Sequence, residues 1–100
     1  MKIIALEREL PGITQEQYSP YLRTEAAMVW ELYQSDRVRE LYFRQDQSTA
    51  VLVLECANIE EARTMLSGLP LVQAGLSDFD LIPLRPYPGF SRLFQSIDQG

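Results

Sequence analysis

Residues Leu66 to Phe90 carry the clearest signals for a helix end and a following strand. They read Leu-Ser-Gly-Leu-Pro-Leu-Val-Gln-Ala-Gly-Leu-Ser-Asp-Phe-Asp-Leu-Ile-Pro-Leu-Arg-Pro-Tyr-Pro-Gly-Phe. Gly68 stands where a left-handed residue would close a helix, and Pro70 prevents that helix from continuing. The residues from Asp78 to Arg85 have the composition of a strand. Because Pro83 has no N–H to donate, we expect this strand at a sheet edge, or ending there.

The chain before this stretch divides into a strand, a helix, two strands and a second helix. Gln45–Ser48 is a polar run between two β-prone segments, which predicts a hairpin loop. The segment that follows the loop is apolar throughout, which is typical of a central strand covered on both faces. The elements are expected at Lys2–Glu7, Thr14–Asp36, Arg37–Arg44, Thr49–Cys56 and from Asn58 onward.

The first helix has two possible starts. Ser19 is a suitable cap with Pro20 at the first helical position, and Thr14 with Gln17 three residues later offers an earlier start. Asn58 caps the second helix, with Glu61 at the position that completes a capping box. On a helical wheel, one apolar face of the first helix comprises Tyr18, Tyr21, Leu22, Val29, Leu32 and Tyr33.

This order of elements predicts an α+β fold, the ferredoxin-like β-α-β-β-α-β arrangement, with an antiparallel sheet and both helices on one face. The 100 residues are expected to form one domain, with a C-terminal arm from about residue 86 to 100. Phe90, Leu93, Phe94 and Ile97 share one side of this arm. The arm folds back on its own subunit, is partly disordered, or reaches the partner subunit. The uncovered sheet face predicts a homodimer or higher homo-oligomer that pairs two sheets.

The composition excludes several classes of function. A net charge of −5 disfavours nucleic acid and gives no basic patch for a membrane. No apolar run approaches the roughly 20 residues of a membrane span, and the first residues are far short of a signal peptide, so we expect a cytoplasmic protein. The lone Cys56 is expected to be a buried thiol. Because the chain has no histidine, we expect neither a metal site nor a cofactor.

The element order, the Leu69-Pro70-Leu71 motif and the strand Phe79-Asp80-Leu81-Ile82-Pro83-Leu84 together resemble the muconolactone isomerase-like proteins of the dimeric α/β-barrel superfamily. The resemblance implies two ferredoxin-like subunits that form a closed barrel, with a ligand pocket between sheet and helices. It assigns a structural role to the Leu-Pro-Leu motif. Family members typically follow the last strand with Arg-His-Pro, whereas this chain has Arg85-Pro86-Tyr87.

Glu25 is the leading catalytic candidate. It falls inside the apolar arc of the first helix, so its carboxylate is expected to face the sheet, where burial raises the pKa of a carboxyl group. Such a group suits an isomerase that moves a proton beside a carbonyl. The alternatives are a structural ion pair with Arg39, Arg44 or Arg85, or a side chain whose end reaches solvent.

A small apolar or aromatic molecule is the expected ligand. Arg44 or Arg85 is predicted to hold an anionic group of that ligand. The leading hypothesis is cofactor-free proton transfer; a non-catalytic binding or interaction module and a cofactor-free oxygenase are the alternatives. The aromatic residues either line the pocket or belong to the core; they are Tyr18, Tyr21, Trp30, Tyr33, Tyr42 and Phe43.

Overall fold

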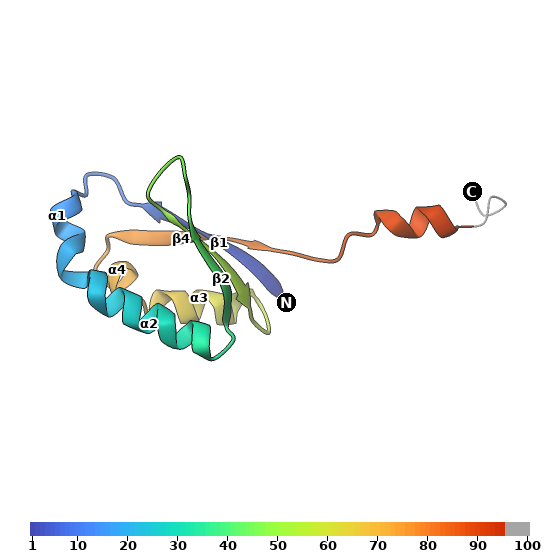
Figure 1. Ribbon diagram of the computed structural model, residues 1–100, viewed down its shortest axis with the longest axis horizontal. Helices are drawn as coiled ribbons and strands as arrows, with labels where there is room; N and C mark the ends of the chain where they lie inside the picture. Colours follow the sequence, from blue (N-terminus) through green and yellow to red (C-terminus); the bar gives the residue numbers. More distant parts are fainter. Residues whose placement is uncertain (96–100) are drawn as a thin grey trace.

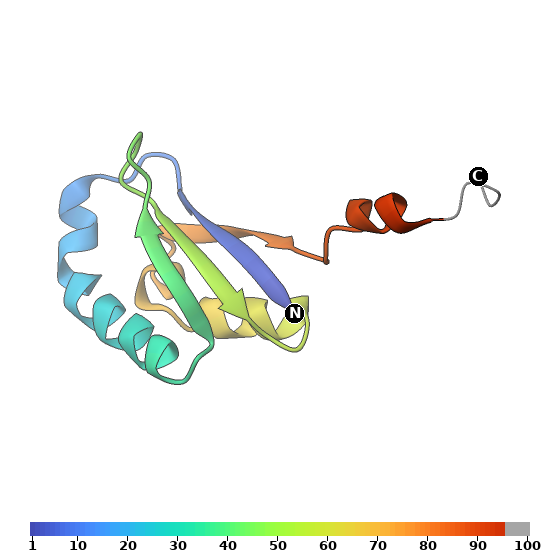
Figure 2. The ribbon, with the colours of Figure 1, turned by 45° about the vertical axis from the view of Figure 1, so that its right-hand side comes forward.

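Four antiparallel strands form one sheet, and the two longer helices pack on the same face of it (Figures 1 and 2). The computed structural model describes residues 1–95. The strands are β1 (Lys2–Glu9), β2 (Val38–Phe43), β3 (Ala50–Glu55) and β4 (Ser77–Pro83), in the order β2-β3-β1-β4. The helices are α1 (Gln15–Tyr18), α2 (Leu22–Gln34), α3 (Ile59–Ser67) and α4 (Pro70–Gln73), with 3-10 turns η1 (Ser19–Tyr21) and η2 (Gly89–Phe94). The predicted ferredoxin-like α+β fold is confirmed.

The sheet register agrees with the positions expected for the strands. Strands β2 and β3 are neighbours joined by the predicted loop, and β3 is an interior strand. Strand β4 lies at an edge, and it ends at Pro83, opposite Ile3 of β1. The edge position accommodates a residue that has no N–H to give to a ladder.

The core lies between the sheet and α3. Alternate residues of β1 and β3 point toward the helices, and Ile3, Ala5 and Leu54 are completely buried there. Leu66 and Leu69 pack against them from the helix layer. Cys56 is buried beside this cluster, as expected for a thiol with no disulfide partner.

The first helical region is not one continuous helix, and this part of the prediction is wrong. Helix α1 starts after Thr14, whose backbone N–H donates to Gln17 Oε1 at 2.7 Å. A 3-10 turn containing Pro20 follows, and α2 leaves it in a different direction (Figure 1). Because Pro20 cannot donate the N–H that an α-helix needs, the chain tightens there. The wheel drawn through both segments therefore overstates the apolar face, since Leu22 is about half exposed.

The exit from α3 differs in detail from the expectation. Asn58 caps the helix by accepting from the Glu61 N–H at 2.8 Å. Gly68 is right-handed, with φ −81°, rather than left-handed. A left-handed glycine follows α4 instead: Gly75, with φ 75°, closes α4 before β4 begins. Pro70 is the first residue of α4, so it starts a new helical turn at an angle to α3.

The other face of the sheet carries an apolar band that no element of the described chain covers. Ile4 of β1 lies opposite Val53 on one side and Ile82 on the other, while Leu6 lies opposite Val51. These residues alternate with the buried ones and point away from the helices. We call this band the open sheet face.

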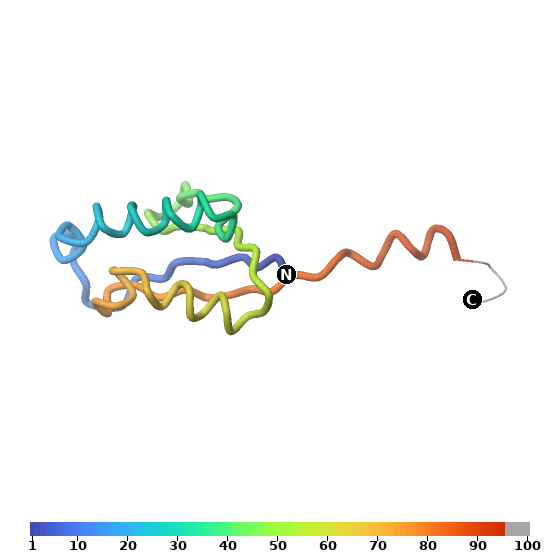
Figure 3. Tube along the Cα trace, turned by 90° about the horizontal axis from the view of Figure 1, so that it is seen from below, coloured from blue at the N-terminus to red at the C-terminus, as the bar shows by residue number. Residues whose placement is uncertain are grey.

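The arm after β4 leaves the sheet instead of folding back (Figures 1 and 3). Its large apolar side chains are exposed, Phe94 to 84%. Tyr87 packs edge-on against Phe90, with ring centroids 5.1 Å apart. Ile97, predicted to extend this apolar side, lies outside the described residues. Within residues 1–95, we find no helix with the length and apolar character needed to cross a membrane.

Candidate functional site

A cavity of about 610 Å³ lies between α2 and the helix-facing side of the sheet. The family resemblance implies a ligand pocket at this location, and the volume is typical of small-molecule sites. Most of its wall is apolar. The lining residues are Glu7, Glu9, Gln15, Tyr18, Leu22, Glu25, Ala26, Val29, Leu41, Tyr42, Phe43, Ser48, Ala50, Leu52, Leu71 and Phe79.

Glu25 enters the cavity from the first turn of α2. Its Oε1 accepts a hydrogen bond from the Leu71 N–H at 2.9 Å, at the start of α4. Loss of hydration on burial raises the pKa of Glu25, and the nearby charge of Glu7 raises it further, while the Leu71 N–H opposes both effects. Among the described residues, no arginine forms the ion pair with Glu25 that was the alternative prediction.

Glu7 is a second carboxylate in the cavity, and the sequence analysis missed it. Its Oε1 accepts from the Ala50 N–H and its Oε2 from the Ser77 hydroxyl, both at 2.9 Å. These bonds connect β1 to the starts of β3 and β4. The signal was present in the sequence, because Glu7 follows Ile3 and Ala5 at the two-residue period of one strand face.

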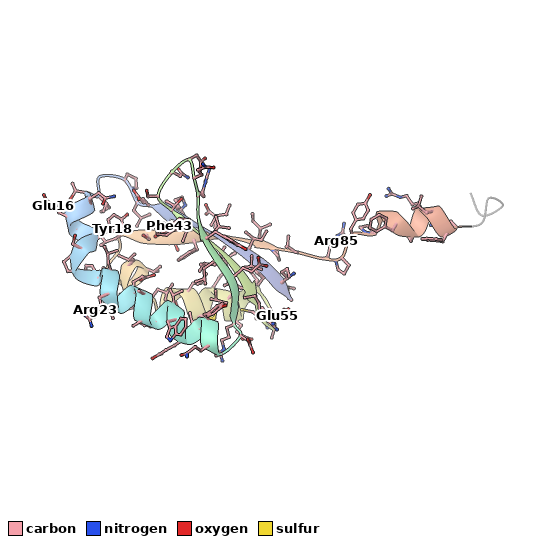
Figure 4. All side chains as sticks on the ribbon, viewed as in Figure 1. Glu16, Tyr18, Arg23, Phe43, Glu55 and Arg85 are labelled. Atoms are coloured by element: carbon pink, nitrogen blue, oxygen red, sulfur yellow. The ribbon has the colours of Figure 1, made fainter. Side chains whose placement is uncertain are left out.

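Tyr18 closes one end of the cavity. Its hydroxyl donates to the Leu76 carbonyl oxygen at 3.0 Å, and burial raises the pKa of this phenol. Figure 4 shows Tyr18 and Phe43 toward the same end of the sheet, whereas Arg23 points outward from α2. Because the Tyr18 hydroxyl already donates to a backbone carbonyl, it is not available to donate to a ligand. Tyr18 therefore contributes its ring to the wall of the cavity.

Only part of the predicted ligand-binding set reaches the cavity. Tyr42 borders the cavity, but it lies opposite Val51, whose side chain belongs to the open sheet face. The Tyr42 side chain is 57% exposed, and its hydroxyl donates to Glu40 at 2.8 Å. Tyr21 and Trp30 are not among the lining residues. Trp30 is also 57% exposed and lies beside Tyr33, with ring centroids 5.8 Å apart.

Neither predicted arginine lies at the cavity. Arg44 forms a two-pronged ion pair with Asp46 in the loop after β2, at 2.9 and 2.6 Å. Arg85 lies on the arm, away from the sheet (Figure 4). The structure therefore brings Tyr18 and Glu25 to one cavity, leaves Tyr42 at its border and leaves the predicted cations outside it.

The titratable side chains that line or border the cavity are three glutamates and two tyrosines. Within residues 1–95, no group of three or more carboxylate or thiol side chains is close enough to hold a metal ion. The polar groups that face the space are carboxylates, amides and hydroxyls. A half-buried carboxylate beside apolar walls is the kind of group that accepts and returns protons.

No family model matches the sequence, and no curated protein matches it either. Several solved structures are similar to it in fold, and two enzymes are among them. Muconolactone isomerase has a TM-score of 0.72 at 18% identity, over 88% of this chain and 92% of that one. The 5-chloro-2-hydroxyhydroquinone dehydrochlorinase of Burkholderia phenoliruptrix AC1100 was solved in complex with 2,5-dihydroxybenzoquinone. It has a TM-score of 0.71 at 13% identity, over 89% of this chain and 98% of that one. The chain thus has the fold of muconolactone isomerase, and the resemblance predicted from the sequence is confirmed at the level of fold.

Proposed function

We propose that this protein is a small-molecule enzyme of the isomerase type, in which Glu25 moves a proton without a cofactor. The observation that carries the proposal is the position of this carboxylate. One oxygen is fixed by the Leu71 N–H, and in the described chain no protein group binds the other. The free oxygen faces a cavity of about 610 Å³. The fold likeness to two enzymes that act on small ring compounds supports the proposal.

The proposed reaction shifts a double bond beside a carbonyl group. Ionised Glu25 takes a proton from the carbon next to the carbonyl of an unsaturated lactone, and the C–H electron pair enters a dienolate. The protonated carboxyl then returns the proton to the far carbon of that dienolate, so substrate and product are isomers. The raised pKa makes the carboxylate a stronger base than an exposed glutamate.

Proton exchange in deuterated water tests this function directly. We expect the protein to speed both deuterium uptake and double-bond migration in α-angelica lactone, a small β,γ-unsaturated lactone, followed by proton NMR. Glu25→Gln keeps an oxygen for the Leu71 N–H but cannot take a proton, so it should lower the rate by roughly 100-fold or more. Glu25→Asp should retain part of the activity.

Glu16→Gln is the matched control, because it removes an exposed carboxylate from α1 that does not line the cavity. Its exchange rate should equal that of the unchanged protein. If Glu25→Gln exchanged as fast as the unchanged protein, the assignment of the base would be wrong. Thermal stabilisation by the lactone without exchange would instead favour a non-catalytic binding module.

We further propose that two chains pair through their open sheet faces. Ile4, Val53 and Ile82 are aligned across three strands on this face. Pairing would remove their apolar surface from water, which is the main driving force of protein association. Both cavities would remain on the helix side of their own sheets.

A further inference from the structure

The cavity has an unbalanced charge. Glu7, Glu9 and Glu25 line it, and no lysine or arginine of the described chain does. These carboxylates come from β1 and α2, which face each other across the space. Cavities with low-polarity walls concentrate the field of the charges that line them. The interior therefore favours cations and disfavours anions.

Three arginines are adjacent in sequence to lining residues. Arg23 points outward from α2 (Figure 4), and Arg8 and Arg44 are paired with carboxylates elsewhere. Arg8 points to the opposite face of the sheet, where its guanidinium lies 3.3 Å from Asp80 and 3.7 Å from Asp78. Two nitrogens of Arg44 donate to the two carboxylate oxygens of Asp46. Arg8 and Arg44 would each have to break an ion pair to approach a ligand in the cavity. The folded structure therefore leaves the carboxylates of the cavity without a neutralising arginine in the described part of the chain.

The free acceptor in the cavity also indicates the ligand chemistry. Both oxygens of Glu7 already accept hydrogen bonds from the protein. Among residues 1–95, Glu25 Oε2 has no such partner, while Oε1 is taken by Leu71. A ligand O–H or N–H can donate to Oε2. A ligand carboxylate offers only further acceptors, and it would meet like charge at short range.

We infer that the cavity takes uncharged or cationic ring compounds with hydroxyl or amino donors, and that it rejects carboxylates. This inference names the ligand class of the site and rests on the proposed function. Leu52, Val29 and Phe79 supply the apolar wall for the ring. Glu25 supplies the acceptor, and Glu7 with Glu9 supply the charge that selects against anions.

Three probes of one shape test the inference on the full chain. They are 4-hydroxybenzyl alcohol, 4-hydroxybenzylamine and 4-hydroxybenzoate, which differ at one substituent and carry zero, positive and negative charge. Dissociation constants are measured by calorimetry at low ionic strength, where charges are least screened. We expect the amine to bind most tightly, the alcohol next, and the benzoate at least roughly tenfold more weakly than the alcohol.

A charge-reversal pair shows whether the selection comes from the cavity. Glu9→Lys should reduce the preference for the alcohol over the benzoate by roughly tenfold or more. Glu16→Lys makes the same change in net charge on α1, outside the lining, and should leave the preference within about twofold. Glu9 is exposed and makes no hydrogen bond through its side chain in the described chain, so the variant is expected to fold.

The outcomes separate this inference from the proposed function. Benzoate binding as tightly as the alcohol overturns the inference, as does an equal effect of Glu9→Lys and Glu16→Lys. Failure of all three probes to bind also overturns it, because the named class is then wrong. The proposed function is judged separately by lactone exchange, which uses an uncharged probe and depends on Glu25 alone.

Discussion

Glu25 combines three influences that act on one carboxyl group. Burial and the charge of Glu7 both disfavour its ionised form, and one backbone N–H, from Leu71, favours that form. The first two influences prevail, so the folded protein holds this proton more tightly than the unfolded chain does. A carboxyl group with a raised pKa makes the stability of the fold depend on pH.

The sign of that dependence is a prediction at the residue scale. Because the folded pKa lies above the ordinary 4.5, Glu25 stabilises the fold fully only below that value, and this contribution is lost as pH rises through the folded pKa. Glu25→Gln carries no such charge. The difference in melting temperature, Glu25→Gln minus the unchanged protein, should therefore increase as the pH is raised from about 4 to about 7. Calorimetry measures this difference. Glu16→Gln should show no comparable rise, and a flat difference for Glu25→Gln would contradict the prediction.

At the scale of elements, the connection from α3 to β4 contains two glycines that differ in backbone conformation. Gly75 closes α4 with φ 75°, and a Cβ added there would meet nothing within 4 Å. Gly68 closes α3 with φ −81°, and its Cβ would make an ordinary contact of 3.6 Å with the Met65 carbonyl oxygen. Space is available at both glycines, so only conformation distinguishes them.

The two glycines give a matched pair of substitutions. Gly75→Ala should lower the free energy of unfolding by about 1 kcal/mol, because an alanine is strained in the left-handed region. Gly68→Ala should be neutral or should stabilise by up to about 1 kcal/mol, because it restricts the unfolded chain without strain. Urea unfolding measures both values. Equal destabilisation by the two changes would mean that the left-handed turn at Gly75 is not required.

At the scale of the whole molecule, one layer of helices covers only one side of the sheet. The open sheet face is apolar in its centre, and the exposed side chains of the arm add further apolar surface. A sheet with one bare apolar face is stabilised when another layer covers it. The proposed pairing of two chains supplies this layer without any additional sequence.

Association in solution tests the pairing. Sedimentation at micromolar concentration should give twice the mass of one chain. Val53→Asp places a charge in the middle of the open sheet face and should yield folded monomers, whereas Thr64→Asp on the exposed surface of α3 should remain dimeric. A monomeric unchanged protein, or a dimeric Val53→Asp variant with native circular dichroism, would contradict the proposal.

The amino-acid sequence was sufficient to predict the class of fold. Strand and helix periods, the Asn58 cap and the edge residue Pro83 are local signals, and the tertiary structure preserves them. The sequence also placed Glu25 on the sheet-facing arc of its helix, since that depends on the helical period alone. Only the tertiary structure determined that Glu7 joins Glu25 and that Arg44 and Arg85 stay away from the cavity. These residues are far apart in the chain. The distances between them depend on the turn at Pro20, on the sheet register and on the charged partner that each side chain has in the folded protein.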